Sequence, residues 1–154
     1  MKHVWSVLCR RSQIDITDNN ISLNEVLEQL TVDINTKRGD IQPNEVNIPI
    51  DYEIVSMWIK EKNESHIKAE IRTEFIDPNG KLLKTFPQPV EMPKDMRRLR
   101  TRFRITGLGL TVPGDYMFVV SVKEVDKKEF RKVSELPLEI HLNKQIIEEM
   151  TPSK

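Results

Sequence analysis

The residues best suited to nucleophilic catalysis or metal binding are one cysteine and three histidines. Cys9 is the only cysteine, and His3, His66 and His141 lie far apart in the sequence. A catalytic thiol needs a base and an orienting group, and metal sites use short clusters of His, Cys, Asp and Glu. These residues show neither spacing, and Cys9 falls on the predicted core face of a strand, where burial raises the pKa of a thiol and makes it unreactive. We predict a structural cysteine, surface histidines and no metal.

Other catalytic signatures are missing from the sequence. There is no GxSxG, no HExxH and no glycine-rich phosphate loop, and the chain contains only five glycines. We therefore predict that the protein is not an enzyme and uses no cofactor.

Arginine recurs at every second position in one predicted strand, over Met96–Ile105. The arginines on one face are Arg98, Arg100, Arg102 and Arg104. At about 6.8 Å spacing, such guanidinium groups could bind phosphates or a carboxylate-rich partner. The alternative is a solvated sheet face whose arginines pair with glutamates of neighbouring strands, such as Glu53, Glu70 and Glu74. The paired face is the favoured hypothesis. Exposed interleaved aromatics, which binding of single-stranded nucleic acid would need, are absent because Phe103 points the other way.

Composition narrows the class of protein further. The 154 residues carry 24 Lys and Arg against 24 Asp and Glu, so no net charge attracts nucleic acid or an anionic membrane. A single cysteine excludes an internal disulfide and fits a reducing compartment. The apolar run before Arg10 is too short for a signal peptide or a membrane span. We predict a cytoplasmic protein.

The elements that must position these residues are strands, organised around Leu108–Val122. Pro113 and Gly114 form a turn, and the residues after it alternate as a strand does. Tyr116 stands at the head of this strand, as in the tyrosine corner of immunoglobulin-like sandwiches, where the hydroxyl bonds to the preceding loop. This motif predicts a β-sandwich.

Further strands follow from alternation. A first strand over Val4–Cys9 places Trp5, Val7 and Cys9 toward the core. Asp15–Asn20 is predicted as a turn, in preference to a calcium loop, because it lacks the glycine that such a loop needs. The remaining strands are predicted over Ile48–Ile59 with Trp58 on its core face, His66–Ile76, Lys81–Phe86, an edge or crossover at Val90–Met92, and Glu129–Leu142 with Pro137 at an edge. Asn79 and Gly80 supply a hairpin turn between the strands predicted over His66–Ile76 and Lys81–Phe86.

The segment from Ser22 to Val32 matches both helical spacing and a strand. The sequence resembles an uncharacterised family of small bacterial proteins. The resemblance lies in the order of Cys9, Asp15, the stretch from Asn20 to Gln29 and the Pro-Gly-Asp-Tyr-Met-Phe motif near residue 115. The resemblance implies a single β-sandwich domain in which Ser22–Val32 is the second strand. It implies no activity.

Together these patterns predict an all-β, antiparallel, immunoglobulin-like sandwich of about seven to nine strands. One domain covers residues 1–143, and the tail 144–154 either frays or forms a helical turn through Ile146 and Ile147. We predict a non-enzymatic interaction module of an intracellular bacterial assembly, whose protein partner the sequence does not identify. A homodimer through an edge strand is one arrangement. The alternatives are a small-molecule or carbohydrate binder that uses end loops, and an anion binder that uses the arginine strand.

Overall fold

The computed structural model describes residues 1–37, 46–61 and 65–147. Within these ranges the chain forms nine strands and no helix, so the predicted all-β class is confirmed. The strands are β1 (Lys2–Ile14), β2 (Ile21–Val26), β3 (Gln29–Lys37), β4 (Val46–Ile59), β5 (Ile67–Ile76), β6 (Leu82–Met92), β7 (Arg98–Leu110), β8 (Gly114–Glu124) and β9 (Arg131–Ile147).

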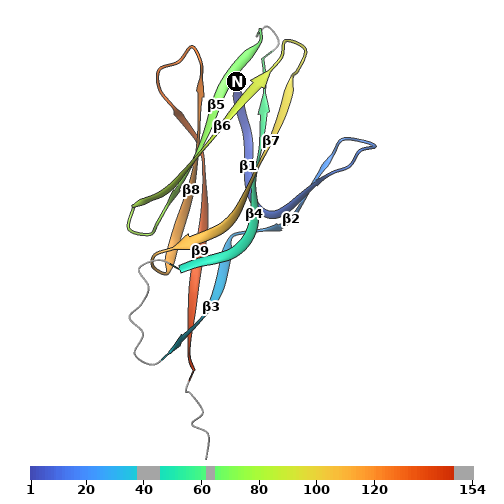
Figure 1. The fold of residues 1–154 in the computed structure, drawn as a ribbon. Helices are drawn as coiled ribbons and strands as arrows, with labels where there is room; N and C mark the ends of the chain where they lie inside the picture. Colours follow the sequence, from blue (N-terminus) through green and yellow to red (C-terminus); the bar gives the residue numbers. More distant parts are fainter. Residues whose placement is uncertain (38–45, 62–64, 148–154) are drawn as a thin grey trace, which may run out of the picture.

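Two sheets enclose the core, as Figure 1 shows. One has the strand order β2-β1-β4-β7, and the other has the order β3-β9-β8-β5-β6. All neighbouring strands are antiparallel except β3 and β9, which run parallel from Gln29 opposite Glu139 to Lys37 opposite Ile147. The prediction of a wholly antiparallel fold is therefore wrong at this pair.

The single strand predicted over Ser22–Val32 is in fact two strands in different sheets. The chain changes sheets at two adjacent residues: Leu27 donates its N–H to the carbonyl of Leu8 in β1, and Glu28 accepts from the N–H of Glu139 in β9. This crossover sends β3 along β9 in the same direction. The choice of strand over helix for this segment is confirmed.

Aromatic side chains fill the space between the sheets. Trp58, Tyr116 and Phe118 are wholly buried at 0% exposure. Phe118 of β8 stacks on Phe75 of β5 with ring centroids 4.5 Å apart, and Tyr52 of β4 meets Phe118 edge-on at 5.8 Å. Burial of these rings stabilises the packing of one sheet on the other.

The core face predicted for the first strand is wrong. Leu8 lies opposite Ile54 and belongs to the core cluster, whereas Val7 and Cys9 alternate onto the other face, opposite Val55 and Glu53. Cys9 is nevertheless fully buried. The alternation in β1 is real, but both of its faces are covered near Cys9, so hydrophobicity alone could not identify the inner one.

The tyrosine corner forms as predicted. Tyr116 Oη donates to the carbonyl of Val112 (2.6 Å) and accepts from the N–H of Thr111 (2.9 Å) and of Val112 (3.1 Å). Thr111 Oγ1 in turn donates to Asp77 Oδ2 (2.9 Å) in the β5–β6 turn, so the corner joins the end of β7 to the opposite sheet. Gly114 has φ 133°, and a Cβ there would lie 3.1 Å from Pro78.

The β5–β6 hairpin turns at Asp77-Pro78-Asn79-Gly80. The N–H of Gly80 bonds the carbonyl of Asp77 at 2.9 Å, and Gly80 has φ 81° whereas Asn79 has an ordinary negative φ. The predicted hairpin is confirmed, but only Gly80 and not Asn79 adopts a positive φ in its turn. The strand that follows it is the edge of its sheet and contains Pro87 and Pro89, in agreement with the edge predicted there.

The C-terminal helical turn predicted through Ile146 and Ile147 is wrong, because β9 continues to Ile147 and pairs with β3 along this length. Backbone hydrogen bonds from β3 satisfy the groups that a helical turn would otherwise satisfy internally. Residues 148–154 of the predicted tail lie outside the described residues.

Candidate functional site

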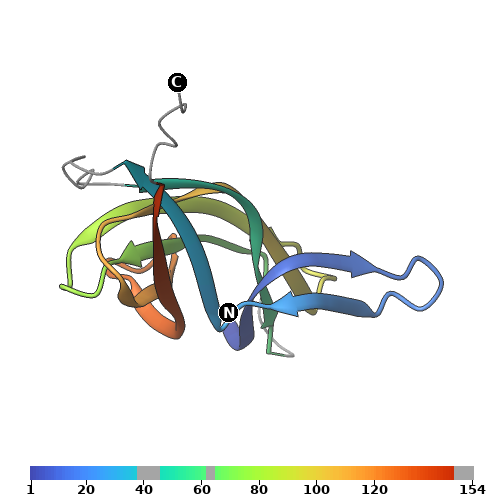
Figure 2. The same cartoon turned by 90° about the horizontal axis from the view of Figure 1, so that it is seen from below.

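The candidate site is the β1–β2 hairpin together with the arginines of β7. β1 pairs with β4 only as far as Cys9, and from Cys9 to Ile14 it pairs with β2. The hairpin therefore leaves the body of the molecule, and Figures 1 and 2 show it projecting from the rest of the fold. Its turn, Asp15–Asn20, confirms the turn predicted there.

Three of the predicted arginines contact this hairpin or the strand at its base. Arg104 Nε bonds Glu53 Oε1 on β4 at 2.8 Å. Arg102 Nη1 lies 3.4 Å from the carbonyl oxygen of Ser12, and Arg100 Nη2 donates to the carbonyl of Asn19 at 2.7 Å and to its side-chain oxygen at 2.5 Å. We call Arg100, Arg102 and Arg104 the arginine brace, because Arg100 and Arg102 connect β7 with two levels of the hairpin and Arg104 connects it with β4 at the base of the hairpin.

Glu53 anchors the base of the brace. Its carboxylate is 7% exposed and accepts hydrogen bonds from both Arg104 and the Ser12 hydroxyl, so each of its oxygens has a partner. A buried carboxylate is stable only with such partners. The predicted pairing of the arginines with Glu53 is confirmed for Arg104. Glu70 and Glu74 lie instead on β5, in the other sheet, where Glu74 contacts Arg72.

Arg98, the fourth predicted arginine, is exposed at the start of β7, and its side chain makes no hydrogen bond or ion pair with the described residues. Binding of an anionic ligand by Arg98 and the brace remains a prediction. Such a ligand would have to compete with the hairpin for Arg100 and Arg102, and with Glu53 for Arg104.

The turn of the hairpin is rigidly bonded. The carboxylate of Asp15 accepts from the N–H of Thr17 (2.7 Å), and that of Asp18 accepts from the N–H of Asn20 (2.9 Å). These backbone hydrogen bonds lower the pKa of both carboxyl groups. Asn19 has φ 60°, a left-handed conformation that asparagine tolerates, and it is the residue that Arg100 holds.

Ile16 lies within this turn and is 99% exposed. Ile14, at the end of β1, is 38% exposed. Sequence reasoning missed Ile16, Ser12 and Asn19 as candidate site residues. A signal was present for Ile16, because an isoleucine inside an aspartate- and asparagine-rich turn has no core to enter.

A hollow of about 450 Å³ lies between the hairpin and the sheet. Arg10, Arg11 and Arg104 line it together with Asp51 and Glu53. Both basic and acidic groups line it, so its charge selects neither an anion nor a cation strongly.

The cysteine and the histidines have structural partners. Cys9 is buried as predicted, and this burial, followed by the charge of Glu53, raises the pKa of its thiol. His66 and His141 are exposed as predicted, but His3 is half-buried, 5.1 Å edge-on to Trp58 and 2.8 Å from Ser6 Oγ. Desolvation lowers the pKa of His3. Among the described residues, no three His, Cys, Asp or Glu side chains are grouped so that they could hold a metal ion.

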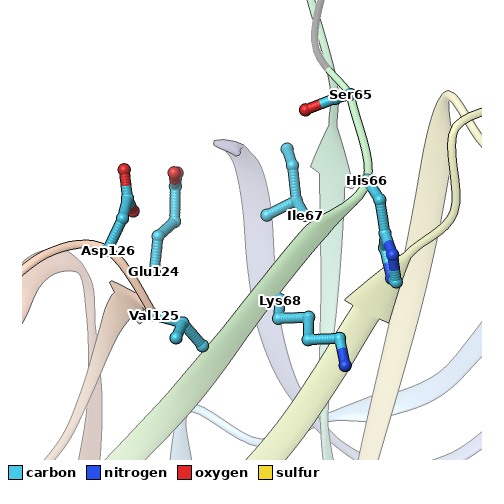
Figure 3. A pocket seen from close by; sticks show the side chains of 7 residues that line it. All are labelled: Ser65, His66, Ile67, Lys68, Glu124, Val125 and Asp126. Carbon is cyan, nitrogen blue, oxygen red and sulfur yellow. The ribbon is translucent and has the colours of Figure 1, made fainter.

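A second hollow, of about 550 Å³, lies at the end of the fold where β5 begins and β8 ends. In Figure 3 the carboxylates of Glu124 and Asp126 lie on one side of it, whereas Lys68 and His66 point to the other. Both basic groups contact Glu91, Lys68 at 3.2 Å and His66 at 3.5 Å. The titratable groups around this hollow therefore do not converge on one point.

Comparison with known proteins adds little to this picture. No protein-family model matches the chain, and no curated protein is similar to it. One similar solved structure is a family 123 glycoside hydrolase from Clostridium perfringens, with 15% sequence identity and a TM-score of 0.36. The likeness covers 75% of this chain but only 23% of the hydrolase chain. In the described part of this chain, no helix has the length and apolar character that crossing a membrane requires.

Proposed function

We propose that the protein is an immunoglobulin-like, non-enzymatic interaction module of an intracellular bacterial assembly, and that it binds a protein partner through the tip of its β1–β2 hairpin. The single observation that carries the proposal is Ile16, which is 99% exposed on a turn held by its own hydrogen bonds and by Arg100.

The strand order supports an immunoglobulin-like domain. In such domains strands B and E share one sheet and strands C, F and G share the other. Here β4 and β7 are neighbours in one sheet, and β5, β8 and β9 are neighbours in the other. Tyr116 stands at the head of β8 where the tyrosine corner of strand F stands, and the contact between Tyr52 and Phe118 joins the sheets without a disulfide. The β1–β2 hairpin is an addition to this pattern.

Rigidity is the physical reason to assign function to the hairpin tip. A two-stranded hairpin alone is marginally stable in water. This one is held by Arg100 and Arg102 of the arginine brace and by the bonds of Asp15 and Asp18 within the turn. A side chain presented by an ordered turn loses little conformational freedom on binding, so more of its burial energy is realised as affinity. Burying one isoleucine contributes about 1.5–3 kcal/mol.

The charges near the tip indicate the chemistry of the partner. Asp15 and Asp18 flank Ile16, and the lowered pKa of each keeps it ionised at neutral pH. An apolar pocket with a basic rim complements this arrangement.

Site-specific photocrosslinking tests the proposal. A photoreactive amino acid replaces Ile16 in one variant and Val125 in a control variant, because Val125 is also an exposed apolar residue (74%) but lies at the far hollow. We expect a specific protein adduct at position 16 only. With the purified partner, Ile16→Ser should weaken binding by roughly tenfold or more and Val125→Ser should not. Equal affinity of Ile16→Ser and the parent protein would refute the proposal.

The hollow at the end of the fold supports a second candidate, a small-molecule or carbohydrate binder. Val125 and the aliphatic part of Lys68 give it an apolar floor, and carboxylates stand at its rim. Saturable binding of a sugar that Val125→Asp abolishes and Ile16→Ser leaves unchanged would favour this candidate over the hairpin.

A further inference from the structure

Four strands stand at the edges of the two sheets: β2 and β7 in one, β3 and β6 in the other. An exposed edge carries unpaired backbone groups that can accept another strand. β6 is blocked by Pro87 and Pro89, which lack the N–H that an added strand would need. β7 is interrupted by Gly107, which has φ 84°, and β2 has only six residues.

β3 is the regular edge. It spans nine residues, contains neither proline nor glycine, and pairs with β9 without any register shift. Glu28, which directly precedes it, turns its carbonyl toward β9. Alternate residues of a strand bond to the same neighbour, so Leu30, Val32 and Ile34 continue this pairing. Thr31 and Asp33 therefore turn their N–H and C=O groups to the open side.

The order of charged residues along β3 indicates which strand would pair with its open edge. Asp33 and Lys37 are four positions apart, with Asn35 midway between them. When two copies of this strand run antiparallel about a two-fold axis at position 35, Asp33 of each comes opposite Lys37 of the other. Opposite charges across an antiparallel pair are favourable, whereas the register that places Asp33 opposite itself is repelled. The pairs 33–37 and 35–35 also use the residues whose backbone groups face the open side.

We propose that β3 is a homodimerisation edge, on which a second copy of this chain pairs antiparallel about an axis at position 35 and joins the two five-stranded sheets into one. The contact is isologous, so it closes a dimer and leaves no further edge of this kind open. Asp33 is exposed, and its Oδ1 accepts from Asn143 Nδ2 at 3.2 Å, which leaves Oδ2 for the partner copy.

Charge exchange tests the proposed register on the full chain. In sedimentation equilibrium we expect wild-type protein to approach twice its 18.0 kDa mass as concentration rises. Asp33→Lys and Lys37→Asp should each weaken the dimer by about tenfold, since two symmetric pairs become repulsive. The double variant Asp33→Lys/Lys37→Asp should restore dimerisation, which loss of the bond to Asn143 could not explain.

Cysteine crosslinking locates the axis independently. Asn35→Cys should form an intermolecular disulfide, because directly paired residues have Cα atoms about 5.5 Å apart. Thr31→Cys is the matched control: eight residue positions, about 26 Å, separate it from its copy in this register. Buried Cys9 does not compete.

A wild-type chain that stays at 18.0 kDa up to millimolar concentration would overturn the proposal, as would crosslinking at position 31 in place of 35. A dimer insensitive to every one of these changes would place the contact elsewhere and would also overturn it. None of these outcomes bears on the hairpin proposal, because Ile16 lies in the turn between β1 and β2, which belong to the other sheet.

Discussion

The hydroxyl of Tyr116 should stabilise the fold measurably, and Tyr116→Phe removes it without changing the ring. Three short hydrogen bonds are lost: the one to the carbonyl of Val112 and those from the N–H groups of Thr111 and Val112. A longer contact with Thr111 Oγ1, at 3.4 Å, is lost with them. At a net ~0.5–1.5 kcal/mol each, the three bonds set a range of about 1.5–4.5 kcal/mol. Tyr116 itself is fully buried, but its partners Thr111 and Val112 are only partly buried, so water can reach the freed backbone groups, and we expect a loss of about 2 kcal/mol.

Urea denaturation and thermal melting both measure this loss. For a domain of this size, about 2 kcal/mol corresponds to a fall in Tm of roughly 4–8 °C. The matched control is Tyr52→Phe, since Tyr52 is also buried (3% exposed) but makes one long hydrogen bond, 3.4 Å, to the carbonyl of Gly107. We expect the control to lose less than about 1 kcal/mol. If the two variants lose equal stability, the corner contributes nothing beyond a buried ring and the reasoning is wrong.

Three further predictions concern other buried groups. Burial alone would raise the pKa of Asp77, but hydrogen bonds from Lys81, Thr111 and Asn79 outweigh it and lower the pKa. The stability that this carboxylate contributes is therefore present at neutral pH and is lost as pH falls through the folded pKa. In urea denaturation between pH 7 and pH 3, the free energy of unfolding of Asp77→Asn should fall less steeply with pH than that of the parent protein, and parallel curves would contradict this. Lys60 is 7% exposed and donates to the carbonyls of Ser65, Pro93 and Lys94. Lys60→Met should therefore lower the free energy of unfolding, measured by urea denaturation, by about 2 kcal/mol. The control Lys68→Met removes an exposed ion pair and should lower it by under about 1 kcal/mol. The Cys9 thiol, buried and raised in pKa, should react with a disulfide reagent at pH 8 only in denaturant, and fast reaction of the native protein would disprove its burial.

Local pattern was enough to predict most of the strands. The stretch around Pro113 and Gly114 specified both a turn and the strand after it, and Tyr116 specified the bond that closes the corner. These features depend on residues close together in the chain, where turn chemistry and the period of two act directly.

The sequence could not show which distant segments of the chain contact each strand. Both faces of β1 are covered near Cys9, so alternation did not reveal that Leu8 faces the core. The arginines were recognised as one face, but their contacts with Ser12 and Asn19 span 90 and 81 residues and left no local trace. The break between β2 and β3 likewise depends on Leu27 and Glu28 bonding to strands distant in sequence.

The parallel pairing of β3 with β9 has a consequence for how the protein folds. The contact between Asp33 and Asn143 spans 110 residues, whereas hairpins such as β5–β6 and β8–β9 close over short loops. Long-range pairings of this kind form late, because the conformational entropy of so long a loop is lost before the strand contacts can compensate for it.

During synthesis, β9 is the last of the nine described strands to leave the ribosome, so β3 has both of its edges unpaired while the other strands of the sheet assemble. Arrival of β9 covers one edge. In the nascent chain, therefore, the interval before β9 emerges is the period of greatest exposure to misassembly, and a chaperone that shields Gln29–Lys37 would act at that stage.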